Sequence, residues 1–67
     1  MSSRTETFEK ISILTPQSLA DLLGLSLRTV EDHRRKGTGP RFMRIGKHVR
    51  YRMSDVQLWL EERYVDR

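Results

Sequence analysis

The chain of 67 residues contains no cysteine, little glycine and proline, and no long apolar run. Without cysteine, neither a disulfide framework nor a thiolate metal site can form. The two histidines, His33 and His48, are not accompanied by other ligand-type residues at metal-binding spacing, so we expect no metal and no cofactor. No apolar stretch approaches the roughly 20 residues that span a bilayer, and none defines a secretion signal. These absences predict a cytoplasmic protein without a membrane partner.

The size and charge of the chain narrow the class of partner. A chain this short buries roughly 60% of its unfolded surface, which leaves room for one small core. The sequence shows no set of nucleophile, base and orienting group and no carboxylate pair that would suggest catalysis. We therefore expect a non-enzymatic protein without a small-molecule substrate. The net charge of +4 and the sequence pI of about 10.1 favour a polyanionic partner.

Two short helices are predicted over residues 16–23 and residues 27–36. Thr15 offers a side-chain oxygen to the free amides of the first helix, and the proline that follows it suits a first helical residue. Gly24 is placed to adopt a left-handed C-cap conformation, and Ser26 caps the second helix. Leucines recur at helical spacing in the first helix. Because the first helix ends at Gly24 and the second is capped by Ser26, the two helices are expected to meet across a tight turn.

A hairpin is predicted over residues 41–53, after a loop that reads Gly-Thr-Gly-Pro. A loop of three residues, 46–48, separates apolar from basic side chains, whereas a two-residue turn mixes them on both faces. We therefore expect the longer loop. The pairs expected on the apolar face are Ile45 with Val49 and Met43 with Tyr51. The residues expected on the cationic face are Phe42, Arg44, Arg50 and Arg52.

A third helix is predicted from Ser54, which with Gln57 forms a capping box. Four side chains at helical spacing are expected to close the core, namely Val56, Trp59, Leu60 and Tyr64. The fold class is thus mainly α with a small β-hairpin, in the order helix, helix, hairpin, helix. Residues 11–67 form this domain, and residues 1–10, which are polar apart from Phe8, are predicted to form a flexible arm.

Positive charge is concentrated in one part of the sequence. Residues 28–52 carry nine basic and two acidic side chains, a local charge of +7, while the rest of the chain sums to −3. This stretch includes the second helix and the hairpin, a combination typical of a DNA-binding helix with an adjacent wing. We therefore expect double-stranded DNA as the partner.

The polar face of the second helix is predicted to enter the major groove. Arg28 and Thr29 lie in its first turn, where helix-turn-helix proteins read bases, and arginine can bond guanine through two hydrogen bonds. Asp32 either accepts from a cytosine amino group or orients Arg28 or Arg35, and we favour the orienting role. The candidate major-groove residues are Ser26, Arg28, Thr29, Asp32, Arg35 and Lys36.

The hairpin is predicted to act as a wing on the DNA backbone or in the minor groove. The candidate wing residues are Arg41, Arg44, Lys47, His48, Arg50 and Arg52. Arg34 lies on the apolar side of its helix, so we expect its stem to pack and its guanidinium to pair with an acid such as Asp21. His33 is interpreted as a packing histidine, and Phe42 as a cover for the helix end or a small contact surface.

Residues 13–63 resemble the small winged helix-turn-helix domains of phage and integrative-element excisionases and related prophage regulators, which have a MerR-like fold. The resemblance rests on LTPQSLADLLGLSLRTV at residues 14–30 and RRKGTGPRFMRIGKHVRYRMSDVQLWL at residues 34–60. In that family the second helix enters the major groove and the wing contacts the minor groove or its phosphates. The resemblance therefore implies the same placement for the residues named above.

The resemblance also implies biological roles. Many such excisionases are recombination directionality factors, which bind near an attachment site and bend it so that an integrase favours excision. We expect this role, with an integrase or recombinase and neighbouring copies of the chain, loaded cooperatively head to tail, as partners. One alternative is a transcriptional regulator of a prophage or integrative element. Another is a protein-interaction adaptor that docks a nucleoprotein assembly through the third helix and Phe42.

Overall fold

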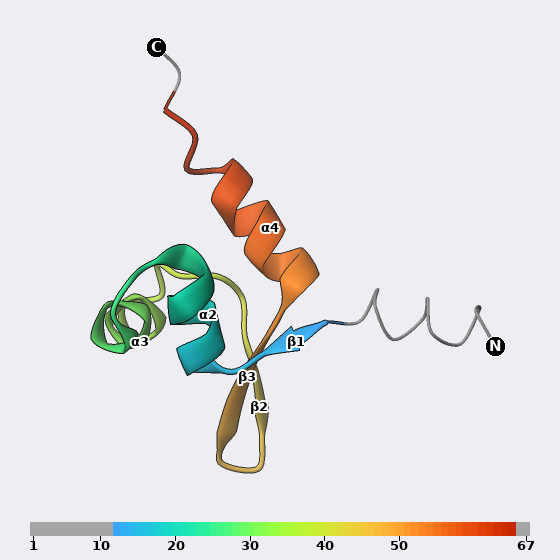
Figure 1. Ribbon diagram of the computed structural model, residues 1–67. Coiled ribbons are helices and arrows are strands. Elements are labelled where there is room, and N and C mark those ends of the chain that lie inside the picture. The colour runs from blue at the N-terminus through green and yellow to red at the C-terminus, as the bar shows by residue number, and fades with distance from the viewer. Residues whose placement is uncertain (1–11, 66–67) are drawn as a thin grey trace, which may run out of the picture.

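A computed structural model describes residues 12–65 of the chain, so the arm predicted for residues 1–10 lies outside the described part. The described part contains three helices and three short strands (Figure 1). In chain order these are β1 (Ile13–Leu14), α2 (Pro16–Leu23), α3 (Leu27–Lys36), β2 (Met43–Ile45), β3 (His48–Arg52) and α4 (Met53–Glu61). The predicted order of two helices, hairpin and third helix is confirmed, and β1 is an element that sequence reasoning missed.

The bounds of α2 and α3 are those predicted, because both helices are capped by their own sequence. Thr15 Oγ1 accepts a hydrogen bond from the Ser18 amide, and Ser18 Oγ accepts one from the Thr15 amide, so the two residues form a capping box. Gly24 ends α2 with φ of 69°, a left-handed conformation that costs glycine little. Ser26 caps α3 by accepting from the Thr29 amide, and the three-residue turn between the helices follows from these two caps.

The core is small and lies where α2, α3, β3 and α4 meet. Its fully buried members are Leu19, Ala20, Val30, Tyr51 and Val56. Leu14, Leu23 and Val49 pack against this cluster and are half-buried. Because each element contributes only one or two side chains, removal of any one of them takes away a large share of the buried apolar surface.

The strands form one antiparallel sheet in the order β1, β3, β2. Leu14 pairs with Tyr51, and Ile13 pairs with Arg52, so β1 covers the edge of β3 that β2 leaves free. The backbone of Ser12 also accepts a hydrogen bond of 2.9 Å from the amide of Met53. The segment before α2 therefore anchors the base of the hairpin and the start of α4.

The predicted register of the hairpin is wrong. The turn contains two residues, Gly46 and Lys47, and the paired residues are Ile45 with His48, Arg44 with Val49 and Met43 with Arg50. Gly46 has φ of 63°, as glycine adopts at the first position of a tight hairpin turn whose twist matches the strands. The tight turn prevails because the hairpin tip extends beyond the core, where no buried face selects the register.

The predicted separation into one apolar and one cationic face is therefore also wrong. Arg44 shares a face with Val49, and Met43 shares the opposite face with Arg50. Phe42 contacts Tyr51, with 6.2 Å between ring centroids, and the Arg44 guanidinium lies 5.9 Å from the Phe42 centroid. Long arginine stems can lie along apolar neighbours while their charged ends stay in water, so a mixed face is stable here.

Two expectations for the third helix are wrong as well. The helix begins at Met53 with Arg52 as N-cap, and no side chain caps it, because β3 runs directly into α4. Ser54 thus lies inside the helix and forms no capping box with Gln57. Of the side chains expected to close the core, Val56 is fully buried, but Leu60 is 37% exposed, and Tyr64 lies beyond the end of α4 and is 83% exposed.

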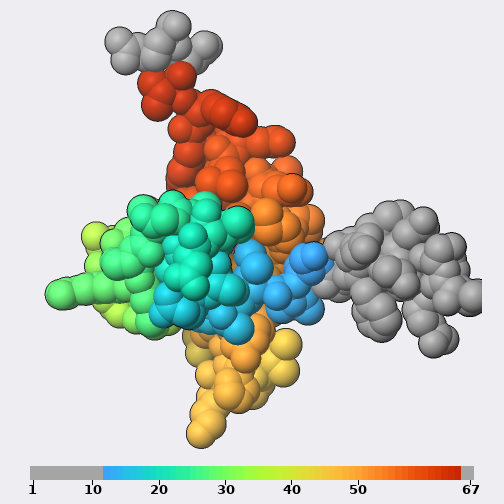
Figure 2. All heavy atoms as spheres, in the orientation of Figure 1, coloured from blue at the N-terminus to red at the C-terminus, as the bar shows by residue number. Residues whose placement is uncertain are grey.

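The elements extend from the core in different directions. The hairpin of β2 and β3 projects to one side, α4 extends to the opposite side, and α2 and α3 pack against each other next to both (Figure 1). In the space-filling view the hairpin is a narrow projection from a broader body (Figure 2). No helix among residues 12–65 is long and apolar enough to cross a membrane.

Candidate nucleic-acid interface

The first turn of α3 is held by hydrogen bonds between two of the predicted major-groove residues. Ser26 Oγ accepts from the Thr29 amide at 3.1 Å, and the two hydroxyl groups lie 3.0 Å apart. The contact between the hydroxyls uses one of their two O–H donors, so one hydroxyl hydrogen and the Thr29 methyl group remain available to a base. Ser26 and Thr29 thus orient the first turn in addition to lying next to the expected DNA.

Arg28, Arg35 and Lys36 form the exposed cationic face of α3. Asp32 forms an ion pair with Arg35 one turn along the helix, as the preferred interpretation of Asp32 expects. The pair holds Arg35 close to the helix and lowers the charge repulsion along this face. Arg28 is exposed at the N-terminal end of the face, where its five N–H donors are available to a ligand.

The hairpin carries its cations on both faces and at its tip. Lys47 lies in the turn, and His48 follows it at the start of β3, both exposed. Arg50 is half-buried, and its Nη1 donates to the carbonyl oxygen of Val49 at 2.7 Å. The exposed arginines of the two strands are Arg44 and Arg52.

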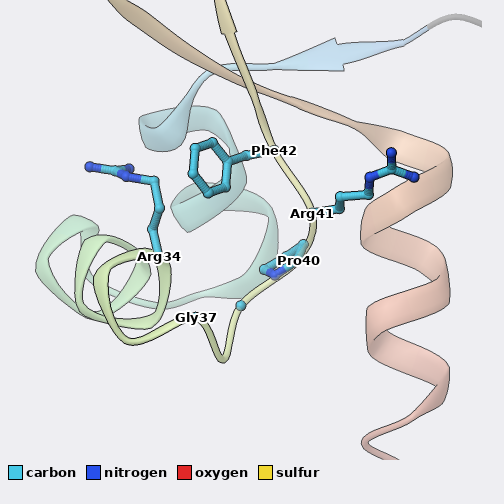
Figure 3. Close-up of a pocket in the computed structure, with 6 residues that line it drawn as sticks. Arg34, Gly37, Pro40, Arg41 and Phe42 are labelled. Carbon is cyan, nitrogen blue, oxygen red and sulfur yellow. The ribbon is translucent and has the colours of Figure 1, made fainter.

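Arg41 is separated from the other predicted wing residues. It precedes β2, and its side chain points toward α4 rather than along the hairpin (Figure 3). The structure therefore brings together the cations of α3 as one group and those of residues 44–52 as another. Arg41 belongs to neither group.

The loop between α3 and β2 is tied to α4 by residues that sequence reasoning did not assign to the interface. The carbonyl oxygen of Thr38 accepts from Trp59 Nε1 at 2.8 Å and from Arg63 Nη2 at 2.9 Å. The Arg63 guanidinium also lies 4.4 Å from the Trp59 ring centroid, a favourable cation–π geometry. These contacts fix the loop, and so set the position of the hairpin relative to α3.

His33 completes this anchor from the α3 side. Its Nδ1 lies 2.7 Å from Thr38 Oγ1, and its ring contacts the Trp59 ring edge-on at 5.8 Å. A Cβ at Gly39 would come within 3.1 Å of the His33 Cβ, so the close approach of the loop favours glycine there. The prediction of a packing histidine with its hydrogen bond satisfied is confirmed. The Gly-Thr-Gly-Pro loop was the available sequence signal for this anchor.

The predicted pair of Arg34 with Asp21 is wrong. Asp21 Oδ1 instead accepts from Gln17 Nε2 at 3.0 Å, because the two lie one turn apart on α2. Arg34 lines a hollow together with the residues that lead into β2 (Figure 3). Its Nη1 is enclosed and has no hydrogen-bond partner among the described residues. No group of three or more histidine, aspartate or glutamate side chains within residues 12–65 is placed to hold a metal ion.

A capped helix with an exposed cationic face beside a narrow cationic hairpin defines a winged helix-turn-helix, whose chemistry is noncovalent contact with phosphates and base edges. Residues 13–64 match the helix-turn-helix domain family, and the chain belongs to that family. Double-stranded DNA is therefore its binding partner, and members of such families are typically non-enzymatic. A search of curated proteins found no matching relative.

Proposed function

We propose that this protein is an excisionase-like architectural factor with a MerR-like winged domain. It binds DNA next to the attachment site of a mobile element, bends it and directs an integrase toward excision. One observation carries the proposal: the cationic helix α3 and the cationic hairpin are separated only by the anchored loop of residues 37–42, so one molecule can contact two successive grooves. The excisionase resemblance of residues 13–63 agrees with this arrangement.

In this proposal α3 reads the major groove. A helix fits this groove, which is about 12 Å wide, and a base edge there presents donors and acceptors specific to each base pair. Arg28 is the principal reader, since it is exposed in the first turn, while Asp32 holds Arg35 toward the adjoining backbone. Lys36 extends the phosphate contacts along the same helix.

The hairpin contacts the minor groove or its phosphates. Its two-residue turn keeps the tip narrow, as a minor groove about 6 Å wide requires. Lys47 and His48 lie at that tip, and Arg44, Arg50 and Arg52 follow along the strands. Contacts of this kind position the protein without reading sequence, and they bend DNA when several copies act together.

Neighbouring copies supply the rest of the specificity. A single module of this type buries only about 600–1,000 Å² of protein surface on DNA, which favours adjacent sites filled head to tail. The α4 end carries exposed apolar side chains, with Leu58 62% exposed and Tyr64 83% exposed, next to the acidic Glu61 and Glu62. This end lies away from the hairpin and complements the basic hairpin of a neighbouring copy in charge (Figure 1).

The test is a footprint across an attachment region and the adjoining promoter, combined with an excision assay that contains the integrase. We expect protection of tandem segments beside the attachment core and stimulated excision. In gel-shift titrations, the mobility of the DNA should change at lower protein concentration as sites are added. Lys47→Ala is the comparison variant, because it should weaken the DNA contact at the hairpin tip while the core stays intact. Protection of a promoter alone, with no effect on excision, would instead indicate a transcriptional regulator. Salt-insensitive partner binding without duplex affinity would indicate an adaptor.

A further inference from the structure

A hollow of about 230 Å³ opens between the C-terminal half of α3 and the segment that enters β2 (Figure 3). Arg34 and Phe42 face it from opposite elements. A liquid water molecule occupies about 30 Å³, so the hollow is large enough for a phosphate group with some of its hydration water. The full lining is Arg34, Gly37, Gly39, Pro40, Arg41 and Phe42.

Arg34 and Arg41 are the charged residues of this hollow, and Arg34 is the one with a shielded nitrogen that lacks a hydrogen-bond partner. It makes no ion pair or side-chain hydrogen bond with any residue in the range 12–65, and its Nη1 is shielded from solvent. A shielded N–H without an acceptor is costly, and the cost is higher for a cation. None of the acids near it in the fold pairs with it: Asp21 accepts from Gln17, Asp32 pairs with Arg35, and Glu31, one turn earlier on α3, forms no ion pair among the described residues. The free protein therefore retains a cation that an external anion can satisfy.

The position of the hollow identifies that anion. When a helix lies in one groove and the hairpin beside it lies in the next groove, one sugar-phosphate strand must pass between them. The hollow lies in the connection between the two, because Arg34 of α3 lines one side and the segment that enters β2 lines the other. The guanidinium fork of arginine matches the oxygens of a phosphate, and the Phe42 ring excludes water that would screen the contact.

We propose that this hollow is the seat of a single backbone phosphate, bound by Arg34, on the strand that separates the two contacted grooves. The inference rests on the DNA-binding arrangement proposed above. It adds to the interface a residue that the sequence pattern assigns to packing, and it makes Arg34 the contact that joins the helix and hairpin halves of the interface.

The experiment combines variants of the full chain with duplexes that carry one neutral methylphosphonate at a time. For the wild-type protein we expect one sensitive phosphate, located between the α3 and hairpin footprints. Its replacement by a methylphosphonate should lower the affinity about tenfold, as loss of a charge-assisted hydrogen bond does. Arg34→Met should bind the unmodified duplex about tenfold more weakly and lose nothing further at that phosphate. Arg35→Met, the matched control one residue away, should keep its sensitivity there.

Stability separates this role from a structural one. Because Arg34→Met removes a shielded N–H without an acceptor and keeps the stem volume, its melting temperature should equal or exceed that of the wild type. Arg34→Lys keeps a cation in the hollow and should retain part of the sensitivity to the neutral phosphate. A lower melting temperature with unchanged affinity of the folded protein would overturn the proposal.

Two further outcomes separate this inference from the proposed function. If Arg34→Met binds its site specifically and is as sensitive as the wild type to each neutral phosphate, the phosphate seat alone is overturned. Binding of free inorganic phosphate in the hollow without any effect of a neutral phosphate in the duplex would overturn it too. Absence of duplex binding by the wild-type protein would overturn the proposed function and the phosphate seat together.

Discussion

The helix-turn-helix half of the molecule, residues 15–37, and the hairpin are stabilised in different ways. Each helix in the first half has its own caps, and Leu19 and Val30 fix the pair to the core. The hairpin contacts the core through β3, at Tyr51 and Val49, while Ile45 next to the turn is 57% exposed. Local signals and burial agree in the first half, whereas only the turn determines the register at the hairpin tip.

This difference matches the two tasks that DNA recognition requires. Base reading needs side chains held on a rigid element, because a small displacement breaks a hydrogen bond to a base edge. Phosphate contacts tolerate more movement, because the attraction of a cation to a polyanion has little directional requirement. We therefore expect α3 to discriminate between sequences and the hairpin to supply affinity, with Thr38 and Trp59 as the link between them.

The largest expected effect is on stability, in a comparison of Leu19→Ala with Ile45→Ala. Leu19 is fully buried, so truncation should cost about 2–5 kcal/mol. A core this small rarely supplies more than about 3–5 kcal/mol, so the variant should be largely unfolded at room temperature. Ile45→Ala should change the free energy of unfolding by less than about 0.5 kcal/mol. Urea unfolding measures both values, and comparable losses would show that the tip is part of the cooperative core.

The next effect is on DNA affinity, in a comparison of Arg28→Ala with Lys47→Ala. Arg28→Ala should lose about 1–3 kcal/mol on the preferred site and little on random duplexes, because a base contact is lost. Lys47→Ala should weaken both duplexes equally and reduce the log–log salt slope by about 0.9, because a phosphate contact is lost. Titrations of both duplexes over a salt series measure these effects. Equal losses from Arg28→Ala on the two duplexes would remove Arg28 from the reading face.

A smaller effect concerns two serines near helix starts. Ser26 caps α3 through its side chain, so Ser26→Ala should cost about 1 kcal/mol of stability. Ser54 lies within the first turn of α4 and makes no capping hydrogen bond, so Ser54→Ala should be close to neutral. Thermal unfolding of the two variants under the same conditions decides the matter. A loss from Ser54→Ala as large as that from Ser26→Ala would argue for a capping box at α4 after all.

The smallest effect tests the link between the two halves. Trp59→Phe removes the donor to the Thr38 carbonyl oxygen, which still accepts from Arg63, so the loss of stability should be about 0.5–1 kcal/mol. The hairpin should exchange its backbone amides faster, while α3 keeps its protection. Hydrogen exchange measures this difference, and Tyr64→Phe is the control because Tyr64 is largely exposed. Uniform acceleration in both halves would show that Trp59 supports the whole core.

Local signals in the sequence specify α2 and α3 and mark the basic stretch that is expected to bind DNA. Thr15, Gly24, Ser26 and Gly37 set the ends of α2 and α3, because caps act on neighbouring backbone groups within a few residues. The excess of basic residues over positions 28–52 indicated the DNA-binding region, since charge is a property of composition.

Contacts between distant segments, by contrast, arise through tertiary packing. The pairing of β1 with β3, the start of α4 at Met53 and the anchoring of Thr38 by Trp59 each join residues far apart in the chain. The unpaired state of Arg34 also depends on which surfaces remain uncovered after the core has formed. A local pattern cannot specify these outcomes, because their free energy comes from burial and geometry that exist only in the folded chain.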